Sequence, residues 1–516
     1  MRRLAAIPVL VVVSACSASR RPVVAPQPSA AERLAAVDAE VRAGCLDCLI
    51  DAYKRFEELR KDPSTAEGAT EGAIRAAALV AVRQRELGMV DDGFLAIARR
   101  LAGEHPAVPS WLPKILDIVD GLPQNGAGVA GPPRTDADLD RMRRMRGNRD
   151  AWMALLRDAA RFDEAAAYTL LSFACGSIDT RDIRREELFA NVEAFAGAPL
   201  IVYRESLCRG IETTTLEPLL AKDARFVEIA YSLGLANQAS RPRPKLDEAE
   251  QFYQQAYTWH RQWPSLTLTM AGVAMTAEDF DRARTMYEET LAYEPHSVDA
   301  LLGIAKALTY LGKYEDAIAA ADRVIAERWY VGDALYWRAY DEMQLMRYDQ
   351  AWSDVEESGK LLIDAEVPKL AGLIAYQRHQ LDVSISRFMT SQERNPFDCE
   401  TRFYLGVVHA ELRHWSDTAN VLGSTAECLQ RAEEGLVEDI ERIRASNLRE
   451  DRKARQIAKR EQQIAEGRRR IATSWYDCAV AYFGLSKKDE ARLFAEKVAD
   501  DEQFGARAKD ILSRLK

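Results

Sequence analysis

Histidines and cysteines are the side chains of this sequence best suited to metal-binding or redox chemistry, and there are six of the former and eight of the latter. His409 and His414 are the closest pair of histidines, five residues apart. Two histidines at this spacing on one helix diverge, whereas a zinc-binding helix carries them four residues apart. The sequence also has no nucleophile elbow, metal cluster or glycine-rich nucleotide loop. We therefore expect no metal site, no cofactor and no enzymatic activity.

The cysteines indicate disulfide bonds rather than catalysis. Three pairs have the spacing of a helical hairpin or of a single turn, and the candidate disulfides are Cys399 with Cys428, Cys175 with Cys208, and Cys45 with Cys48. Spacing alone does not fix connectivity, so these pairs are candidates. The CxxC of Cys45 and Cys48 lacks the strand–helix context of a redox site. Cys478 lies on the inward face of its expected helix, and we predict that it is a free, buried thiol.

The first residues predict an export signal. A short basic start precedes an apolar run from Leu4 to Val13, as in a signal peptide. The stretch "VSAC", Val13 to Cys16, resembles the lipobox of bacterial lipoproteins, in which the cysteine becomes the first residue after cleavage and carries the lipid. The resemblance implies that residues 1–15 are a lipoprotein signal peptide and that Cys16 is lipidated. The alternative is a plain secretory signal with a coincidental cysteine.

Residues 16–31 are expected to be the lipidated cysteine followed by an extended tether, because they are rich in proline and lack periodicity. Ser17, directly after Cys16, resembles the residue type of outer-membrane sorting. The resemblance therefore implies an anchor in the bacterial cell envelope, in the outer membrane and facing the periplasm. Export to this compartment would permit disulfide bonds.

The composition of the chain limits which classes of protein it can belong to. The net charge is −10, with 70 basic residues against 80 acidic ones, which argues against a general nucleic-acid binder. Hydrophobic residues make up 47 % of the chain, as in a well-packed globular protein. No stretch offers the roughly 18 uninterrupted apolar residues that a membrane-spanning helix needs.

Residues recur every 34 positions in the second half of the chain. The recurring positions are Ala271, Ala305 and Ala339; Ala283, Ala317 and Ala351; and the rings Phe280, Tyr314 and Tyr348. A fourth unit carries Gly372 and Phe388, and a fifth carries Gly406 and Trp415. This pattern resembles the tetratricopeptide repeat (TPR) family, which has one helix–turn–helix per repeat. The resemblance implies an all-α, right-handed superhelix, or solenoid, whose small residues let neighbouring helices cross closely.

The pattern is weaker on both sides of this array. Residues 32–222 have helical periodicity without a faithful 34-residue register, so we expect an N-terminal helical domain with degenerate repeats. A separate helical domain is the alternative. Residues 223–427 hold the expected TPR array, and residues 472–516 hold a C-terminal repeat with a capping helix.

Residues 428–471 interrupt the array with a charged helical arm. Leucine and isoleucine recur there every seven residues with a break near Ser446 and Asn447, which predicts a two-helix hairpin that projects from the solenoid. From Arg442 to Arg470 the segment has 11 basic and 4 acidic residues. Two interpretations stay open: a solvated arm, or a contact with an acidic partner or anionic lipid head groups.

The TPR resemblance implies that the first helix of each repeat lines a concave groove for a peptide or helix of another protein. The positions expected to face this groove are Leu268, Met275, Leu302, Lys306, Tyr310, Tyr336, Tyr340, Met343, Lys369, Leu373, Tyr376, Phe403 and Val407. Four of these rings, Tyr336, Tyr340, Tyr376 and Phe403, are the expected anchors for a partner, because aromatic side chains dominate interface energetics.

These features favour a non-catalytic, lipid-anchored TPR scaffold for protein–protein interactions in the cell envelope, in assembly, secretion or pilus-type complexes. An outer-membrane receptor lipoprotein that binds a glycan or peptide is the second hypothesis, although such receptors have long loops rich in Gly, Asn and Trp, and Gly is only 27 of 516 residues here. An envelope enzyme is the third. The expected partners are an envelope protein or peptide in the groove and the membrane through the N-terminal lipid, without nucleic acid.

Overall fold

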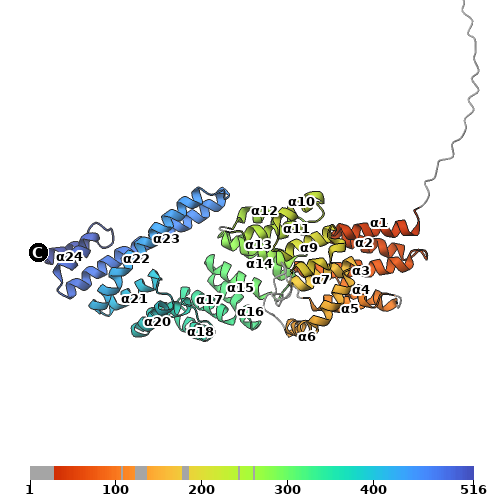
Figure 1. The fold of residues 1–516 in the computed structure, drawn as a ribbon. Helices are drawn as coiled ribbons and strands as arrows, with labels where there is room; N and C mark the ends of the chain where they lie inside the picture. The colour runs from red at the N-terminus through yellow and green to blue at the C-terminus, as the bar shows by residue number, and fades with distance from the viewer. Residues whose placement is uncertain are drawn as a thin grey trace, which may run out of the picture.

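The computed structural model describes residues 28–105, 108–122, 136–176, 185–241, 244–259 and 262–515. In these ranges the chain folds into α-helices joined by turns and one 3₁₀ helix, and no strand occurs. The helices follow one another along an elongated body (Figure 1). The predicted all-α solenoid is confirmed. The signal peptide, Cys16 and most of the tether lie outside the described residues.

The N-terminal part contains ten helices in the described ranges. Their bounds are α1 Ala30–Ala43, α2 Leu46–Leu59, α3 Ala66–Leu87, α4 Phe94–Glu104, α5 Trp111–Gly121, α6 Asp136–Ala159, α7 Glu164–Gly176, α8 Arg185–Ala190, α9 Pro199–Cys208 and α10 Thr213–Lys222. Helix α3 contacts α2, α4, α5 and α7. One hydrophobic core runs from Val37 in α1 to Val273 in the first repeat of the array, so the N-terminal helices and the array share buried surface.

The rest of the chain is built mainly from helix pairs. The bounds are α11 Glu228–Gln238, α12 Leu246–Tyr257, α13 Pro264–Thr276, α14 Phe280–Tyr293, α15 Val298–Tyr310, α16 Tyr314–Ala326, α17 Val331–Gln344, α18 Tyr348–Leu361, α19 Glu366–Gln377, α20 Leu381–Arg394, α21 Cys399–Glu411, α22 Trp415–Arg444, α23 Glu450–Gly484, α24 Lys488–Lys497 and α25 Gly505–Arg514. Each first helix packs against its second helix and against the next repeat. None of the helices in the described residues combines the length and apolarity needed to cross a bilayer.

The same turn ends the first helix of each repeat from α13 onward. One residue adopts a left-handed conformation, and these residues are Glu278, Gly312, Met346, His379, Arg413 and Ser486. The next residue donates its backbone N–H to the carbonyl five positions earlier. Examples are the bond from Lys313 to Leu308, at 2.9 Å, and the bond from Arg347 to Glu342, at 2.8 Å. This is the Schellman motif that closes a helix at its C-terminus. The first five left-handed positions are 33 or 34 residues apart, so the backbone repeats with the period of the sequence.

The small residues of the repeat lie where the two helices of a pair meet. Ala305 and Ala339 are fully buried. A Cβ added at Gly372 would lie 2.6 Å from the Phe388 ring, and one at Gly406 would lie 2.3 Å from Leu422. Larger side chains at these positions would force the helices apart, as the prediction from the sequence requires.

All three candidate disulfides are present in the structure. Each joins residues that are close in sequence: Cys45 to Cys48, Cys175 to Cys208, and Cys399 to Cys428. The third bond crosses the fifth repeat, from the start of α21 to the middle of α22. Cys478 is free and buried, as predicted, and burial raises the pKa of its thiol to about 12.

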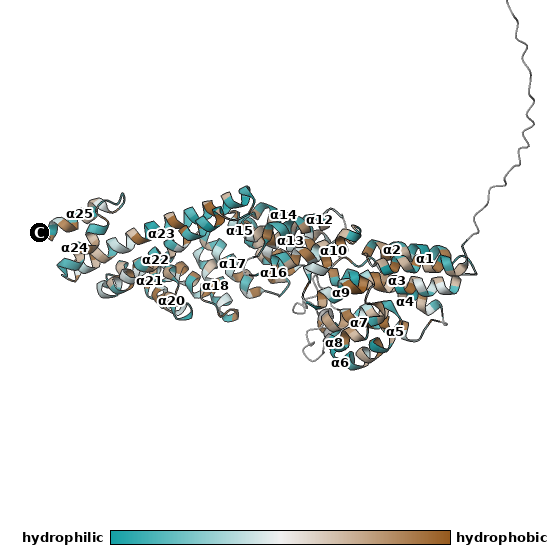
Figure 2. Cartoon of the chain, turned by 45° about the horizontal axis from the view of Figure 1, so that its top comes forward, coloured by the Kyte–Doolittle hydropathy of each residue, from teal (hydrophilic) through white to brown (hydrophobic). Residues whose placement is uncertain are grey.

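The arm is an extension of two repeat helices. Helix α22 begins as the second helix of the fifth repeat, and α23 ends as the first helix of the sixth. The predicted break near Ser446 is the turn between them, and Ile440, Ile464 and Ile471 are buried along their seam. Near this turn α23 is largely hydrophilic, with hydrophobic residues between the polar ones (Figure 2).

Candidate functional site

The end of the arm is attached to helix α12 by buried ion pairs. The Arg452 guanidinium lies 2.7 Å from carboxylate oxygens of both Asp247 and Glu250, and Arg452 is only 1 % exposed. The backbone N–H of Arg449 donates to Asp247 at 2.7 Å, and its side chain lies 3.5 Å from Glu250. We call these four residues the clasp. Two carboxylates at one buried guanidinium compensate the cost of removing that charge from water.

A second set of contacts joins the middle of the arm to the α13–α14 turn. Lys459 and Arg460 each lie 3.0 Å from Glu278, the left-handed residue of that turn. Arg455 lies 3.7 Å from Asp279. These pairs are more exposed than the two pairs of Arg452, so each contributes less to docking.

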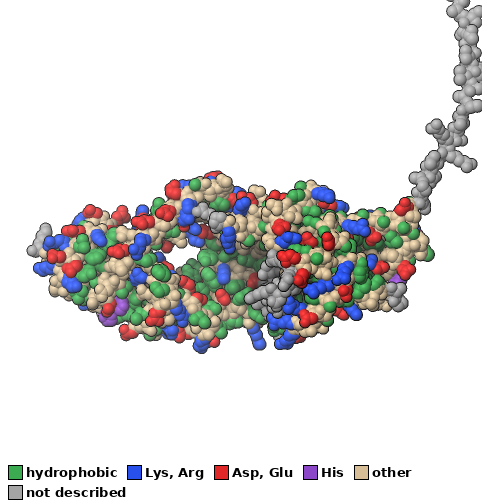
Figure 3. All heavy atoms as spheres, in the orientation of Figure 1, with side chains coloured by type: hydrophobic (Ala, Val, Ile, Leu, Met, Phe, Trp, Pro, Cys, Tyr) green, Lys and Arg blue, Asp and Glu red, His purple; other side chains and the backbone are tan. Residues whose placement is uncertain are grey.

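The arm therefore does not project freely, and the expectation that it does is wrong. Its basic residues face acidic side chains of the same chain, so neither a fully solvated arm nor an external acidic partner is needed to explain the charge excess. At the other end Arg470 binds Glu400 of α21 at 2.7 Å. The repeats from α13 to α21 and the docked arm close a ring, and Figure 3 shows an opening that passes through the molecule beneath the arm.

A group of rings lies at the start of α14 and on the first helices α15 and α17. Phe280 stacks on Tyr310 with centroids 4.7 Å apart, and Tyr310 contacts Trp337 at 5.8 Å. Trp337 in turn contacts Tyr336 at 5.6 Å and Tyr340 at 6.3 Å. We call these five residues the aromatic cluster. It runs without interruption across three repeats, from α14 through α15 to α17.

The arm and one lysine of the groove border the aromatic cluster. The Lys459 ammonium lies 5.8 Å from the centre of the Tyr310 ring, which is the contact that places the cluster beneath the arm. The Lys306 ammonium lies 5.7 Å from the Trp337 ring. Tyr310 is 51 % exposed, and Tyr336, Trp337 and Tyr340 are half-buried. Large, partly exposed rings bordered by cations suit the binding of apolar and acidic side chains.

Trp337 is the residue of this site that sequence reasoning missed. The 34-residue period predicts Tyr336 and Tyr340 as groove positions but not the residue after Tyr336. The sequence does hold a signal for it. Trp337 lies between Tyr336 and Tyr340 on a helix whose buried contact is already provided by Ala339, so the indole is not needed for packing.

Two predicted groove residues belong to the core instead. Leu302 and Phe403 are each 8 % exposed, so they offer no surface to a partner. Phe403 packs with Leu422 and Cys478, because α23 covers this side of α21. Leu302 packs in the core of the first repeats. Their assignment to the groove is wrong.

Lys369 is also unavailable as a cation for a ligand. Its ammonium lies 2.7 Å from Glu400, 3.1 Å from Asp398 and 3.7 Å from Glu366. Burial would lower its pKa, but these carboxylates, Glu400 foremost, outweigh that effect and hold the pKa above its ordinary value. Lys369 is thus a permanent cation that fixes three acids at the α19–α21 contact.

The remaining predicted groove positions are half-buried. They are Leu268, Met275, Met343, Leu373, Tyr376 and Val407. The pKa of Tyr376 is raised to about 12, mainly by burial and to a smaller extent by a hydrogen bond to Glu411. Burial likewise raises the pKa values of Tyr336 and Tyr340. These phenols stay neutral at physiological pH, so they serve as apolar surfaces with a polar tip rather than as bases.

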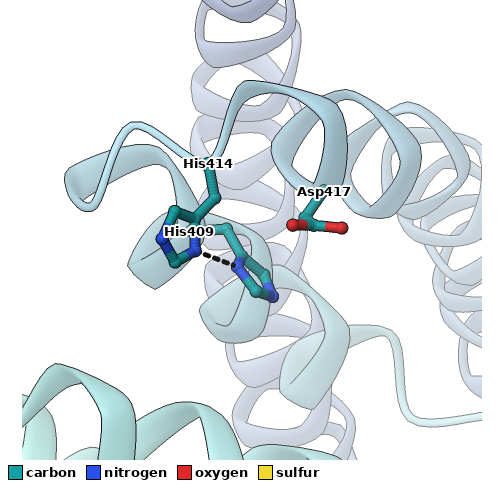
Figure 4. Close-up of side chains that lie close together, drawn as sticks. All are labelled: His409, His414 and Asp417. Atoms are coloured by element: carbon teal, nitrogen blue, oxygen red, sulfur yellow. Dashed lines mark hydrogen bonds between the residues drawn. The ribbon is translucent and has the colours of Figure 1, made fainter.

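His409 and His414 do not diverge as the sequence spacing predicts. Helix α21 ends at Glu411, and the left-handed Arg413 turns the chain back. The two rings therefore face each other with Nδ1 atoms 3.3 Å apart, and Asp417 lies beside them (Figure 4).

The comparisons with known proteins agree with the repeat architecture. A family model of the tetratricopeptide repeat matches residues 268–331. Among curated protein sequences, none matches this chain.

Three solved structures show the level of similarity. The chain is similar to YrrB, a TPR protein with an unusual peptide-binding site, at 16 % sequence identity and a TM-score of 0.30. The match covers 34 % of this chain and 91 % of YrrB. A tetratricopeptide repeat protein from Parabacteroides merdae matches at 16 % sequence identity and a TM-score of 0.31. This match covers 58 % of the present chain and 98 % of the Parabacteroides protein. A chain of the Cut9–Hcn1 hetero-tetramer of the APC/C matches at 13 % sequence identity and a TM-score of 0.37. This match covers 94 % of the present chain and 90 % of the other.

The family match covers residues 268–331, and the helix pairs and the turn that recurs every 33 or 34 residues continue the same pattern beyond it. The part of the chain from α13 onward is therefore an array of tetratricopeptide repeats.

Proposed function

We propose that this protein is a non-catalytic, lipid-anchored scaffold of the bacterial cell envelope that holds an extended segment of a partner protein between its repeats and its arm. The TPR fold itself suggests a protein–protein interaction scaffold. The observation that carries the finer proposal is the aromatic cluster beneath the docked arm, where Lys459 of α23 contacts Tyr310 of α15.

The chemistry of this site favours a segment with apolar and acidic side chains. Packing of the solenoid does not require an exposed Tyr310, and its ring continues a surface formed by Trp337 and Tyr340. Interface hot spots are enriched in tryptophan and tyrosine, because these rings bury large area with few rotatable bonds. Lys306 on the Trp337 indole adds a cation for a carboxylate.

Photo-crosslinking in cells identifies the occupant. We expect a photoreactive phenylalanine analogue in place of Tyr340 to give adducts with one extended segment of an envelope protein. The control is the same analogue in place of Phe397, which is 87 % exposed on the turn before α21 and outside the aromatic cluster.

The crosslinked segment is then made as a peptide and titrated into the purified protein. Trp337→Ala is expected to weaken binding by about thirtyfold, the effect of losing a hot spot worth about 2 kcal/mol. Phe397→Ala should bind as tightly as wild type. Equal adducts from both positions, or full affinity of a folded Trp337→Ala protein, would move the binding site elsewhere.

The lipid anchor has its own test. Cys16→Ala is expected to move the protein from the membrane pellet to the soluble fraction, because acyl chains contribute about 0.8 kcal/mol per buried methylene and several chains hold a protein firmly. The measurement is fractionation of cells with an alkaline wash. If variant and wild type stay equally in the washed pellet, Cys16 does not carry the anchor.

A further inference from the structure

The turn between α21 and α22 brings together three side chains that commonly bind metals. His409 is the third residue from the end of α21, and His414 is the second residue beyond its cap, so the Schellman bond joins them: the His414 N–H donates to the His409 carbonyl at 2.9 Å. Side chains at these two positions of the motif meet, as they do for Tyr482 and Lys487 in the sixth repeat, where the ammonium lies 5.7 Å from the ring.

We propose that His409, His414 and Asp417 form a binding site for a divalent transition-metal ion of the zinc class. The two Nδ1 atoms are 3.3 Å apart. Two nitrogens bound to one tetrahedral zinc ion at about 2.05 Å are separated by about 3.3 Å, so the pair already has the spacing that the ion requires. One atom of each residue, including an Asp417 oxygen, lies within 4.8 Å of the others.

The donor set selects the class of ion. Two imidazole nitrogens and one carboxylate favour zinc and its neighbours over magnesium and calcium, which prefer oxygen ligands. His414 and Asp417 are exposed and His409 is half-buried, so a fourth coordination position faces solvent. Three protein ligands with an open position leave room for water or for a side chain of a bound protein.

The site lies at the end of the fifth repeat opposite the disulfide, where a short turn connects α21 to α22. The Cys399–Cys428 bond joins α21 and α22 away from this turn, at the start of α21. A metal ion held by the last turn of α21 and the first turn of α22 would link the same two helices at their connection.

Zinc titration of the untagged full chain tests the proposal, with cobalt as a spectroscopic probe. We expect one equivalent of zinc to bind and cobalt to give the intense visible absorption of tetrahedral coordination. His414→Ala should weaken zinc binding at least about tenfold and abolish the cobalt band, since it removes one of three protein ligands. His296→Ala is the matched control, because His296 is exposed and pairs with Glu327 in another repeat.

The outcomes separate a metal site from a simple hydrogen bond between imidazoles. Full zinc affinity in the His414→Ala protein overturns the proposal. So does the absence of saturable binding to wild type below about 100 μM zinc. Weaker zinc binding by an Asp417→Asn variant, together with an altered cobalt spectrum, supports the carboxylate as the third ligand.

Discussion

Arg452→Ala is expected to release the end of the arm from α12. The substitution removes the guanidinium shared by Asp247 and Glu250, which are both largely buried. Glu250 keeps its ion pairs with Arg282 and Arg449, and Asp247 keeps the Arg449 backbone N–H, so we expect the lower end of the cost of a broken buried pair. Breaking a buried ion pair by removing one partner costs about 3–5 kcal/mol. At 1.4 kcal/mol per factor of ten, the docked state loses about a hundredfold or more in population relative to the open one.

The distance between the arm and α12 measures this effect. Spin labels at Asn447 and Gln255, both exposed, report the separation of the hairpin turn from α12 by pulsed electron resonance. Wild type should give a short, narrow distribution, and Arg452→Ala a longer and broader one. Arg468→Ala is the control, because its partner Glu433 lies within the arm. An unchanged distance distribution in the Arg452→Ala protein would show that the half-buried pairs at Glu278 suffice to hold the arm.

Glu228→Ala is expected to destabilise the N-terminal part by about 3–5 kcal/mol. Glu228 and Arg83 are both 0 % exposed, and their side chains approach to 2.5 Å. The same carboxylate accepts the backbone N–H of Leu46 at 2.8 Å. Burial raises the pKa of Glu228, against which Arg83 is the main opposing influence. The alanine variant leaves a buried guanidinium and a buried N–H without their acceptor.

Thermal and urea unfolding check this prediction. Glu228→Gln should lose less stability than alanine, because its amide oxygen keeps an acceptor for Leu46. Glu58→Ala is the surface control: its pair with Lys61 is about 70 % exposed on both sides, so the change should stay within about 0.5 kcal/mol. A Glu228→Ala protein that unfolds like the control would mean that Arg83 finds compensation elsewhere, with Tyr168 and Tyr203 as its nearest partners.

The fold was predictable because the repeat uses local rules. Ala305 and Ala339 mark the helix crossings by their size, and Ser446 marks the break between the two seams of the arm. Cys399 and Cys428 face each other because an antiparallel pair brings such positions together. In each case a period or a short separation in sequence determines the contact.

The docking of the arm was not predictable in the same way. Arg452 and Glu250 are 202 residues apart, and acidic residues at the start of a helix are usual without any partner. Periodicity shows that a charged arm exists but not which acids it meets. Phe403 was misassigned for a related reason, because only the packing of α23 over α21 reveals that its ring is covered. The histidine pair depended on where α21 ends, and sequence fixes helix boundaries poorly.

The ring closed by the clasp limits how a partner enters and leaves. A groove that is open on one side releases its ligand sideways, whereas a segment within a closed ring departs only by sliding out lengthwise or after the clasp opens. A partner with folded domains on both sides of its bound segment is then mechanically interlocked with the protein. Under the proposed function, the lifetime of the complex depends on how often Arg452 leaves Asp247 and Glu250. High salt screens the half-buried pairs at Glu278 that support the clasp, so we expect it to shorten that lifetime without changing the contacts inside the ring.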